Sequence, residues 1–190
     1  YAWSNGVQNA VAFNPIISGV YTVVGSSSAG CSASATLQLV VNPVPTINIV
    51  TLPSTTICSG NPVTLTANGG VSYSWTSSIN NAIPFYPTSP NIYTVTGTNQ
   101  QGCTGTATTT VTVNALPVVS AGVDQTVCGG SSVTFTATGA TNYVWNNGAT
   151  GASLTVQTGT NLSSTSYFVT GTNSSTGCSS NDIVLVNVLG

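Results

Sequence analysis

Apolar and polar residues alternate along much of the chain, and threonine occupies most of the polar positions. Residues 63–67, 93–98, 108–113 and 133–137 each place apolar groups on one face and threonine on the other. Such a period of two, in segments rich in Val, Tyr and Thr, is typical of half-buried β-strands. Because no segment has the spacing of an amphipathic helix, the pattern predicts an all-β protein.

One frame of aromatic, glycine and cysteine residues occurs three times. It reads Tyr-x-Trp, Tyr-x-Val, Gly-Cys and Val-Asn, and its tryptophans are separated by 72 and then 70 residues. The copies are Tyr1/Trp3, Tyr21/Val23, Gly30/Cys31 and Val41/Asn42; Tyr73/Trp75, Tyr93/Val95, Gly102/Cys103 and Val113/Asn114; and Tyr143/Trp145, Tyr167/Val169, Gly177/Cys178 and Val186/Asn187. Repetition at a nearly fixed period indicates one folding unit laid end to end. Arrays of this kind act through length, spacing and surface.

The length of each copy favours a β-sandwich. About 70 residues with roughly six to eight short strands, separated by Gly, Asn and Ser, are typical of two packed antiparallel sheets. We predict the C-terminal half of a repeat in residues 1–42 and complete repeats in residues 46–114 and 118–190. Proline-containing joints separate these segments, and proline stiffens a joint toward an extended form.

The first copy lacks the residues that correspond to 50–70 of the second copy. Two explanations are open. In the first, the chain is a stretch of a longer protein; in the second, a neighbouring subunit donates the missing strands. We expect the first, because the C-terminal copy has no spare strand to donate.

The cysteines are distributed as one pair in each complete copy. Cys58 and Cys103 lie in the second copy, and Cys128 and Cys178 lie in the third. This distribution predicts one intradomain disulfide per repeat and an oxidising, non-cytosolic compartment. A metal site is the alternative, although the chain lacks CxxC spacing and histidine. Cys31 is the odd cysteine, and we expect its partner in the missing part of the first copy.

The chain has no Lys, Arg or His, and its only acidic residues are Asp124 and Asp182. Binding to nucleic acid or to anionic lipid needs basic side chains, so we expect neither kind of partner. Acid–base and nucleophilic catalysis need His, Lys or tuned carboxylates, and Ca²⁺ needs several oxygen ligands that include carboxylates at close spacing. We therefore expect a protein that is not an enzyme and that has no catalytic residue, cofactor or metal. Direct membrane insertion is not expected, because no apolar run approaches the roughly 20 residues of a spanning helix.

Two aromatic rings lie on one face of a predicted strand in each complete copy, at Tyr73 and Trp75 and at Tyr143 and Trp145. Packing between the sheets is the expected explanation, and a sugar-stacking platform is the alternative. Phe168 departs from the pattern because the second copy has threonine at that position. The last strand is apolar on both faces, so it is either well covered or forms, with Phe168, a docking surface for a neighbouring repeat or subunit. Its apolar residues are Ile183, Val184, Leu185 and Val186.

The motifs in residues 127–137, 143–148, 167–170 and 177–178 resemble the tandem Ig-like and PKD-like repeats of large Bacteroidetes cell-surface proteins. Residues 57–66 and 93–96 match as well, so the resemblance covers essentially the whole chain. It implies secretion by the type IX system and roles as adhesins, gliding-motility filaments or stalks between functional modules. The chain departs from the pattern in having almost no carboxylates, whereas many PKD-like relatives carry acidic loops.

These observations together favour a structural role outside the cell or at its surface. We expect a segment of a long fibre, stalk or adhesin whose partners are adjacent repeats of the same or identical chains. A polysaccharide-binding sandwich is the first alternative, with surface polysaccharide as its partner. A self-assembling filament subunit, whose N-terminal half-domain is completed by a neighbour, is the second.

Overall fold

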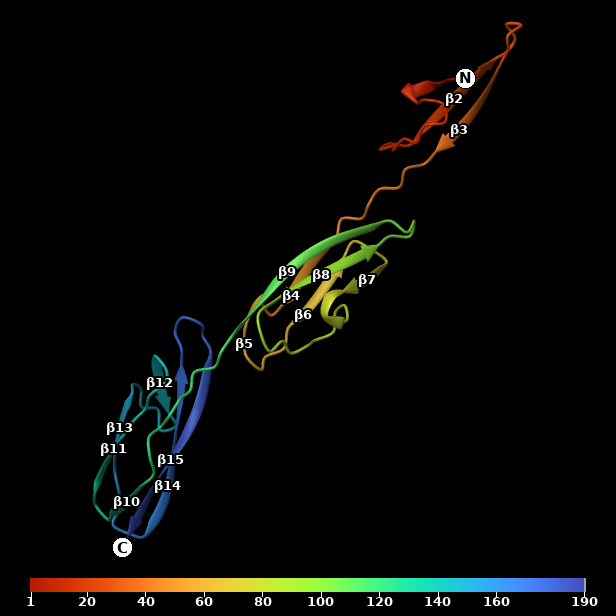
Figure 1. The fold of residues 1–190 in the computed structure, drawn as a ribbon. Coiled ribbons are helices and arrows are strands. Elements are labelled where there is room, and N and C mark those ends of the chain that lie inside the picture. The colour runs from red at the N-terminus through yellow and green to blue at the C-terminus, as the bar shows by residue number, and fades with distance from the viewer. Residues whose placement is uncertain (190) are drawn as a thin grey trace.

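A computed structural model describes residues 1–189 as three successive groups of strands along an elongated molecule (Figure 1). We call these groups unit one (β1–β3), unit two (β4–β9) and unit three (β10–β15). Short linkers without regular secondary structure join them. The prediction of an all-β array of sandwiches is confirmed, although its disulfide pairing is not.

Unit two is a sandwich of two sheets, one of order β5-β9-β8-β7 and one that pairs β4 with β6. Its elements are β4 (Asn48–Leu52), β5 (Thr56–Cys58), β6 (Thr64–Asn68), β7 (Ser72–Trp75), the 3-10 turn η2 (Thr76–Ser78), β8 (Asn91–Thr98) and β9 (Thr104–Asn114). The inward side chains of both sheets form one core, which includes Leu65, Trp75, Val95 and Val111. The threonines that alternate with them face outward, as the period of two requires.

Unit three repeats this architecture, with sheets of order β10-β15-β14-β12 and β11-β13. Its strands are β10 (Gln125–Cys128), β11 (Ser132–Thr136), β12 (Asn142–Trp145), β13 (Ser153–Gln157), β14 (Ser163–Thr172) and β15 (Ser179–Leu189). Phe135, Trp145, Val169 and Val184 belong to a separate core. Each complete unit therefore buries its own apolar face.

Unit one is a single sheet of order β1-β2-β3. Its elements are β1 (Ala2–Trp3), the 3-10 turn η1 (Ser4–Gly6), β2 (Gly19–Ser26) and β3 (Ser32–Leu39), which correspond to β7, η2, β8 and β9 at a constant offset of 72 residues. Among residues 1–189 no second sheet covers its inner face, so Val23 is half-buried where the equivalent Val95 is fully buried.

The first strand of each four-stranded sheet runs parallel to the last strand of its unit. This pairing places Cys58 opposite Asn114 and Cys128 opposite Leu189. The equivalent of Asn114 is therefore Leu189, and the predicted equivalence of Asn187 is wrong by two residues. The physical reason is that β15 continues beyond Asn187, where Val188 still packs into the core of unit three.

In each complete unit a glycine between two strands makes a close backbone contact with the start of the unit. Gly139 has a φ of +92°, and a Cβ built on it would lie 1.7 Å from the carbonyl oxygen of Val118. Gly69 stands in the same relation to Thr46, at 2.0 Å. Only glycine fits at such a position, because any side chain would displace the incoming linker.

We expect Gly139→Ala to destabilise unit three by about 2 to 5 kcal/mol, since it adds backbone overlap to left-handed strain. Gly148→Ala is the matched control, because Gly148 also has a positive φ but its added Cβ would meet no atom within 4 Å. The control is expected to lose only about 1 to 2 kcal/mol. Urea titration read by hydrogen-exchange mass spectrometry reports unit three separately from unit two. Equal losses for the two variants would contradict the close contact with Val118.

Candidate functional site at the junction between units

The candidate site is the junction at which unit two passes into unit three. Cys58 ends β5, beside Asn114 at the end of β9, and the amide of Ser59 donates to the Asn114 carbonyl over 2.8 Å. The linker to unit three begins immediately after Asn114. Parallel pairing of β5 with β9 thus holds Cys58 where the chain leaves unit two.

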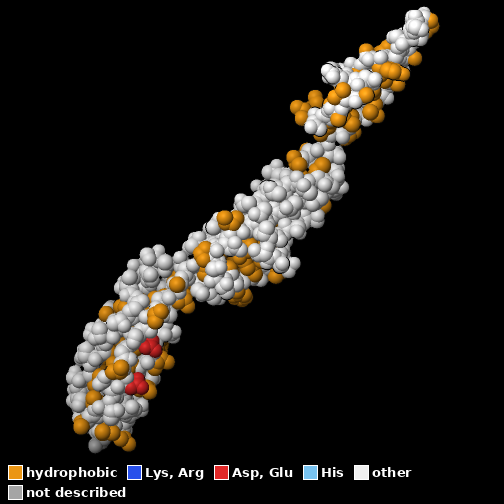
Figure 2. Space-filling model, viewed as in Figure 1, with side chains coloured by type: hydrophobic (Ala, Val, Ile, Leu, Met, Phe, Trp, Pro, Cys, Tyr) orange, Lys and Arg blue, Asp and Glu red, His pale blue; other side chains and the backbone are white. Residues whose placement is uncertain are grey.

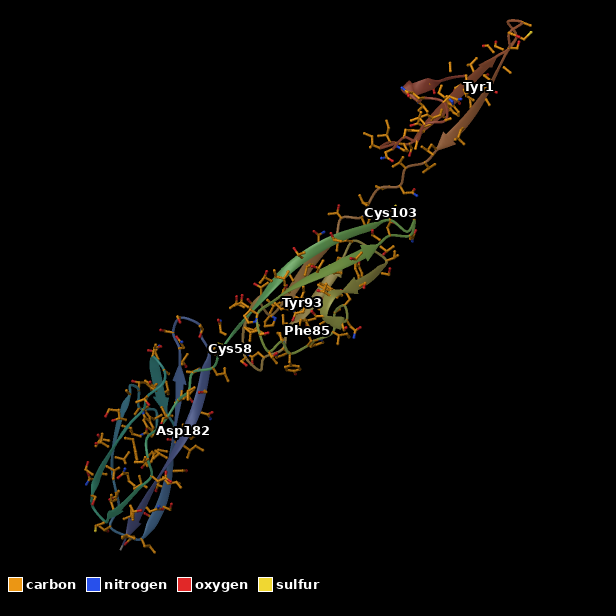
Figure 3. The ribbon with its side chains drawn as sticks, in the orientation of Figure 1. Tyr1, Cys58, Phe85, Tyr93, Cys103 and Asp182 are labelled. Atoms are coloured by element: carbon orange, nitrogen blue, oxygen red, sulfur yellow. A yellow bond between two sulfur atoms is a disulfide. The ribbon has the colours of Figure 1, made fainter. Side chains whose placement is uncertain are left out.

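Cys178 faces this point from the turn between β14 and β15. Gly177 forms the turn with a φ of +72°, and the amide of Asn173 donates to the Cys178 carbonyl over 2.9 Å. Cys178 is fully buried and is disulfide-bonded to Cys58, with their Cα atoms 5.6 Å apart and a sequence separation of 120. The bond therefore joins two units covalently beside their linker (Figure 3).

A side-chain hydrogen bond also ties the linker to unit three. The Ser180 hydroxyl donates to the carbonyl of Pro117, which lies in the linker. The linker is thus held by this hydrogen bond in addition to the disulfide that bridges it. Such a junction restricts bending and twisting of one unit relative to the next.

The predicted intradomain pairs, Cys58 with Cys103 and Cys128 with Cys178, are wrong. Cys58 lies at the level of Asn114, the last residue of β9, whereas Cys103 immediately precedes Thr104, the first. Ten strand residues at about 3.4 Å each separate the two levels by roughly 34 Å. A disulfide requires Cα atoms within about 7 Å. The two cysteines of one unit are therefore too far apart, and Cys178 bonds to the preceding unit instead.

Cys103 occupies in unit two the position that Cys178 occupies in unit three. Its amide and that of Gln101 donate to the Asn99 side-chain oxygen, and its thiol donates to the Asn42 carbonyl with the sulfur 3.8 Å from the oxygen. The Asn99 amide group also donates to the carbonyl of Pro43 over 2.9 Å. Cys103 thus faces the linker between units one and two.

Three cysteines in the described part of the chain are free, namely Cys31, Cys103 and Cys128. Each lies in a different unit, and residues 1–189 contain no group of three or more His, Cys, Asp or Glu that could hold a metal ion. Cys31 is exposed in the turn before β3.

The uncovered face of unit one contains a hollow lined by Tyr1, Val23, Gly25, Ala33 and Ala35, among others. In unit two the equivalents of Gly25 and Ala33 lie under the side chain of Ile47. A Cβ built on Gly97, the equivalent of Gly25, would lie 2.3 Å from the terminal carbon of Ile47. In unit three a methyl group of Val119 occupies the same place above Gly171. The hollow is therefore a socket that a side chain fills in both complete units.

Two further features of this face match contacts made in unit two. The rings of Phe13 and Tyr21 lie 5.3 Å apart, as those of Phe85 and Tyr93 lie 5.1 Å apart. In unit two the backbone of Phe85 exchanges two hydrogen bonds with Val63. Within residues 1–189 no such strand lies beside Phe13, so its backbone groups remain available for pairing.

Asn9 provides the second of these features. In unit two the Asn81 side-chain oxygen accepts hydrogen bonds from the Trp75 indole and from the Ala67 amide. In unit one the equivalent Asn9 oxygen accepts the bond from Trp3 over 3.2 Å. The strand that would supply the second bond has no counterpart in the described residues of unit one. Neither Asn9 nor the hollow follows from sequence patterning, but alignment of the copies at an offset of 72 would have identified both.

The tryptophans of the complete units lie in the core. Trp145 is 1% exposed and its indole donates to the Gly151 carbonyl over 3.1 Å; Trp75 is 8% exposed. Their rings therefore cannot stack on a sugar without unfolding of the sandwich. Trp3 is half-buried on the uncovered face.

The candidate contact surface of unit three divides between its two faces. Val184 and Val186 point into the core, whereas Phe168 and Ile183 are paired across β14 and β15 and remain 42% and 59% exposed. Leu185 is exposed beside them, and the Asp124 carboxylate accepts its amide hydrogen bond over 2.9 Å. Of the five residues of this predicted surface, Phe168, Ile183 and Leu185 have exposed side chains, whereas Val184 and Val186 do not.

Both acidic residues join the segment before β10 to β15 by hydrogen bonds. Figure 2 shows acidic side chains on unit three alone. The Asp182 carboxylate accepts the amide hydrogen bond of Ala121 over 2.9 Å, and that of Asp124 accepts the amide of Leu185. Each carboxylate satisfies a backbone donor of the other segment.

No helix in the described part of the chain has the length and apolar character needed to span a bilayer.

Comparisons with known proteins found similar solved structures at low sequence identity. No protein-family model and no curated protein matches the chain. The chain is similar to titin domains z1z2 solved in complex with telethonin, at 17% identity over 79% of this chain and 98% of that chain, with a TM-score of 0.31. It is also similar to a 1.5-MDa bacterial ice-binding adhesin, at 15% identity over 90% and 74% of the two chains, with a TM-score of 0.36. A Ca²⁺-stabilised adhesin of an Antarctic bacterium has 13% identity over 91% of this chain and 57% of its own, with a TM-score of 0.38.

Proposed function

We propose that the chain is a structural segment of a long extracellular repeat protein, a surface fibre, stalk or adhesin that spaces or presents binding modules. Residues 1–42, 46–114 and 118–190 are its successive repeats in this proposal. In this role the array sets the distance between binding modules and bears force along its length. The junctions between units are therefore more important for its function than any pocket.

The observation that carries the proposal is the disulfide between Cys58 and Cys178. A bond within one unit would stabilise that unit alone, whereas a bond across a linker restrains two units as one stiff piece. Disulfides persist in oxidising compartments, which supports a location outside the cytosol. A surface almost free of charge, with no site for trypsin-like proteases, suits exposure outside the cell.

The resemblance to Bacteroidetes repeat proteins supports a finer proposal. On this basis the chain belongs to a type IX-secreted adhesin, gliding-motility filament or stalk. Its partners are the adjacent repeats of the same or identical chains, with the exposed Phe168 and Ile183 surface available for lateral contact. A polysaccharide-binding role is less favoured, because burial of Trp75 and Trp145 removes the best sugar-stacking residues.

Immunogold electron microscopy of intact source cells tests the proposed role. Antibodies raised against residues 46–190 are expected to label the outer surface without permeabilisation, with gold particles held at a distance from the membrane. Pre-immune serum and an antibody to a cytosolic protein are the controls. Label that requires permeabilisation would contradict an extracellular spacer.

A further inference from the structure

The disulfide defines two kinds of cysteine by their place in a unit. Exit cysteines, Cys58 and Cys128, lie beside the strand end at which the chain leaves the unit. Turn cysteines, Cys31, Cys103 and Cys178, follow the glycine of a Gly-Cys turn at the opposite end. The observed bond joins the exit cysteine of unit two to the turn cysteine of unit three.

Cys103 faces the junction between units one and two in the same way that Cys178 faces the junction between units two and three. Cys178 bonds to a cysteine held opposite Asn114, and the Cys103 sulfur lies 3.8 Å from the carbonyl oxygen of Asn42, the equivalent of Asn114. An exit cysteine opposite Asn42 would therefore be adjacent to Cys103. Unit one has no such cysteine among residues 1–42, because it lacks the counterpart of β5.

The uncovered face of unit one specifies the segment that would supply this cysteine. Its socket would accept a side chain equivalent to Ile47 or Val119. The Phe13 backbone would pair with the backbone of a Val63 equivalent. The Asn9 side chain would accept a hydrogen bond from the amide of an Ala67 equivalent. In unit two the three partners Ile47, Val63 and Ala67 all lie in residues 46–72, a segment that also contains Cys58. In unit two that segment runs directly into β7 through Ser72.

We propose that unit one is completed by a segment with the frame of residues 46–72, joined directly before Tyr1, and that the cysteine of this segment bonds to Cys103. Consecutive units are then linked by one disulfide at every junction, from exit cysteine to turn cysteine. The same rule assigns Cys128 to the turn cysteine of a following unit. It also assigns Cys31 to the unit before unit one, rather than to a partner within its own unit.

Formation of the bond is a two-electron oxidation. The two thiols lose two protons and two electrons, a sulfur–sulfur bond forms, and a disulfide oxidant such as oxidised glutathione is reduced to two thiols. Exchange through a mixed disulfide with Cys103 accomplishes this without any other group of the chain. The inference goes beyond the proposed function, because the bond would form in any sufficiently oxidising compartment.

The test extends the full chain by a second copy of residues 46–72 placed before Tyr1. The added copy carries Ile57→Val, so that its cysteine peptide has a mass of its own. After oxidation with a glutathione redox buffer and acid alkylation, chymotryptic peptides are mapped by mass spectrometry, since the chain has no site for trypsin. The expected result is a bond from the added cysteine to Cys103, with Cys58–Cys178 retained. The three free cysteines of the unextended chain would then become two.

Two matched variants separate the junction rule from intradomain pairing. In the extended chain, Cys103→Ser is expected to leave the added cysteine as a thiol, whereas Cys31→Ser is expected to leave the new bond intact. A bond from the added cysteine to Cys31 would overturn the proposal in favour of intradomain pairing. A disulfide-linked dimer of the unextended chain through Cys103 would overturn it in favour of a neighbouring copy.

A second extension keeps the proposal open to refutation if the added N-terminal segment does not fold. Residues 115–190 are placed after Leu189, the equivalent of Asn114, which reproduces the junction between units two and three with a complete unit. Cys128 is expected to bond to the added turn cysteine, and Cys128→Ser is expected to leave that cysteine free. Free thiols at both Cys128 and the added turn cysteine would refute the junction rule. This outcome is independent of the immunogold result, which tests the proposed function.

Discussion

A pulling force on the two ends of the oxidised chain is expected to extend it by about 400 Å less than the same force on the reduced chain. The Cys58–Cys178 bond spans 120 residues of sequence and holds its two Cα atoms 5.6 Å apart. Unfolded residues extend by about 3.3 to 3.6 Å each, so the closed loop removes roughly 400 Å of reach. The force can peel β4 and β15, which lie outside the loop, but it bypasses most of the cores of units two and three.

Single-molecule force spectroscopy measures this difference as contour length released before and after addition of a reductant. Cys178→Ser is expected to give the long extension without reductant, because it lacks the bond. Cys128→Ser is the matched control and is expected to behave as the parent chain, since Cys128 is free. Equal extensions for the oxidised parent and Cys178→Ser would rule out the crosslink between units.

Trp145→Ala is expected to destabilise unit three by about 3 to 5 kcal/mol, the usual loss for a buried tryptophan in a core. Trp145 is almost fully buried, packs near Phe135 with ring centroids 6.4 Å apart, and satisfies the Gly151 carbonyl with its indole. Truncation leaves a cavity and an unsatisfied acceptor. Guanidinium titration with hydrogen exchange of β12 and β14 as the readout measures the loss.

Trp3→Ala is the matched control, because Trp3 occupies the same place in the frame on a sheet that no second sheet covers among residues 1–189. We expect this change to lower the stability of units two and three by less than about 0.5 kcal/mol, as for surface substitutions remote from a core. A loss in unit three comparable to that of Trp145→Ala would show that unit one supports the other units, which the separate cores do not predict.

The local structure of the chain could be predicted from the sequence because strands carry their signal in neighbouring residues. Alternation predicted the strands around residues 63–67 and 133–137, and the repeated frame predicted that Trp75 and Trp145 occupy equivalent core positions. The alternation in Ile183–Val186 was ambiguous because both faces are apolar there. Only the pairing of β14 with β15 shows that Val184 is internal and that Ile183 is external.

The sequence by itself determined the all-β class, and its repeated frame predicted the repeated unit and the incomplete first copy, since each depends on local pattern or on spacing along the chain. The tertiary structure alone decided which cysteines are bonded. Parallel pairing of β5 with β9 places Cys58 at one end of unit two, and Cys103 lies at the other end. The linker brings Cys178 of unit three to within bonding distance of Cys58. A disulfide depends on distance in space rather than on the number of cysteines per repeat, and this distance is set by strands that pair across more than 50 residues.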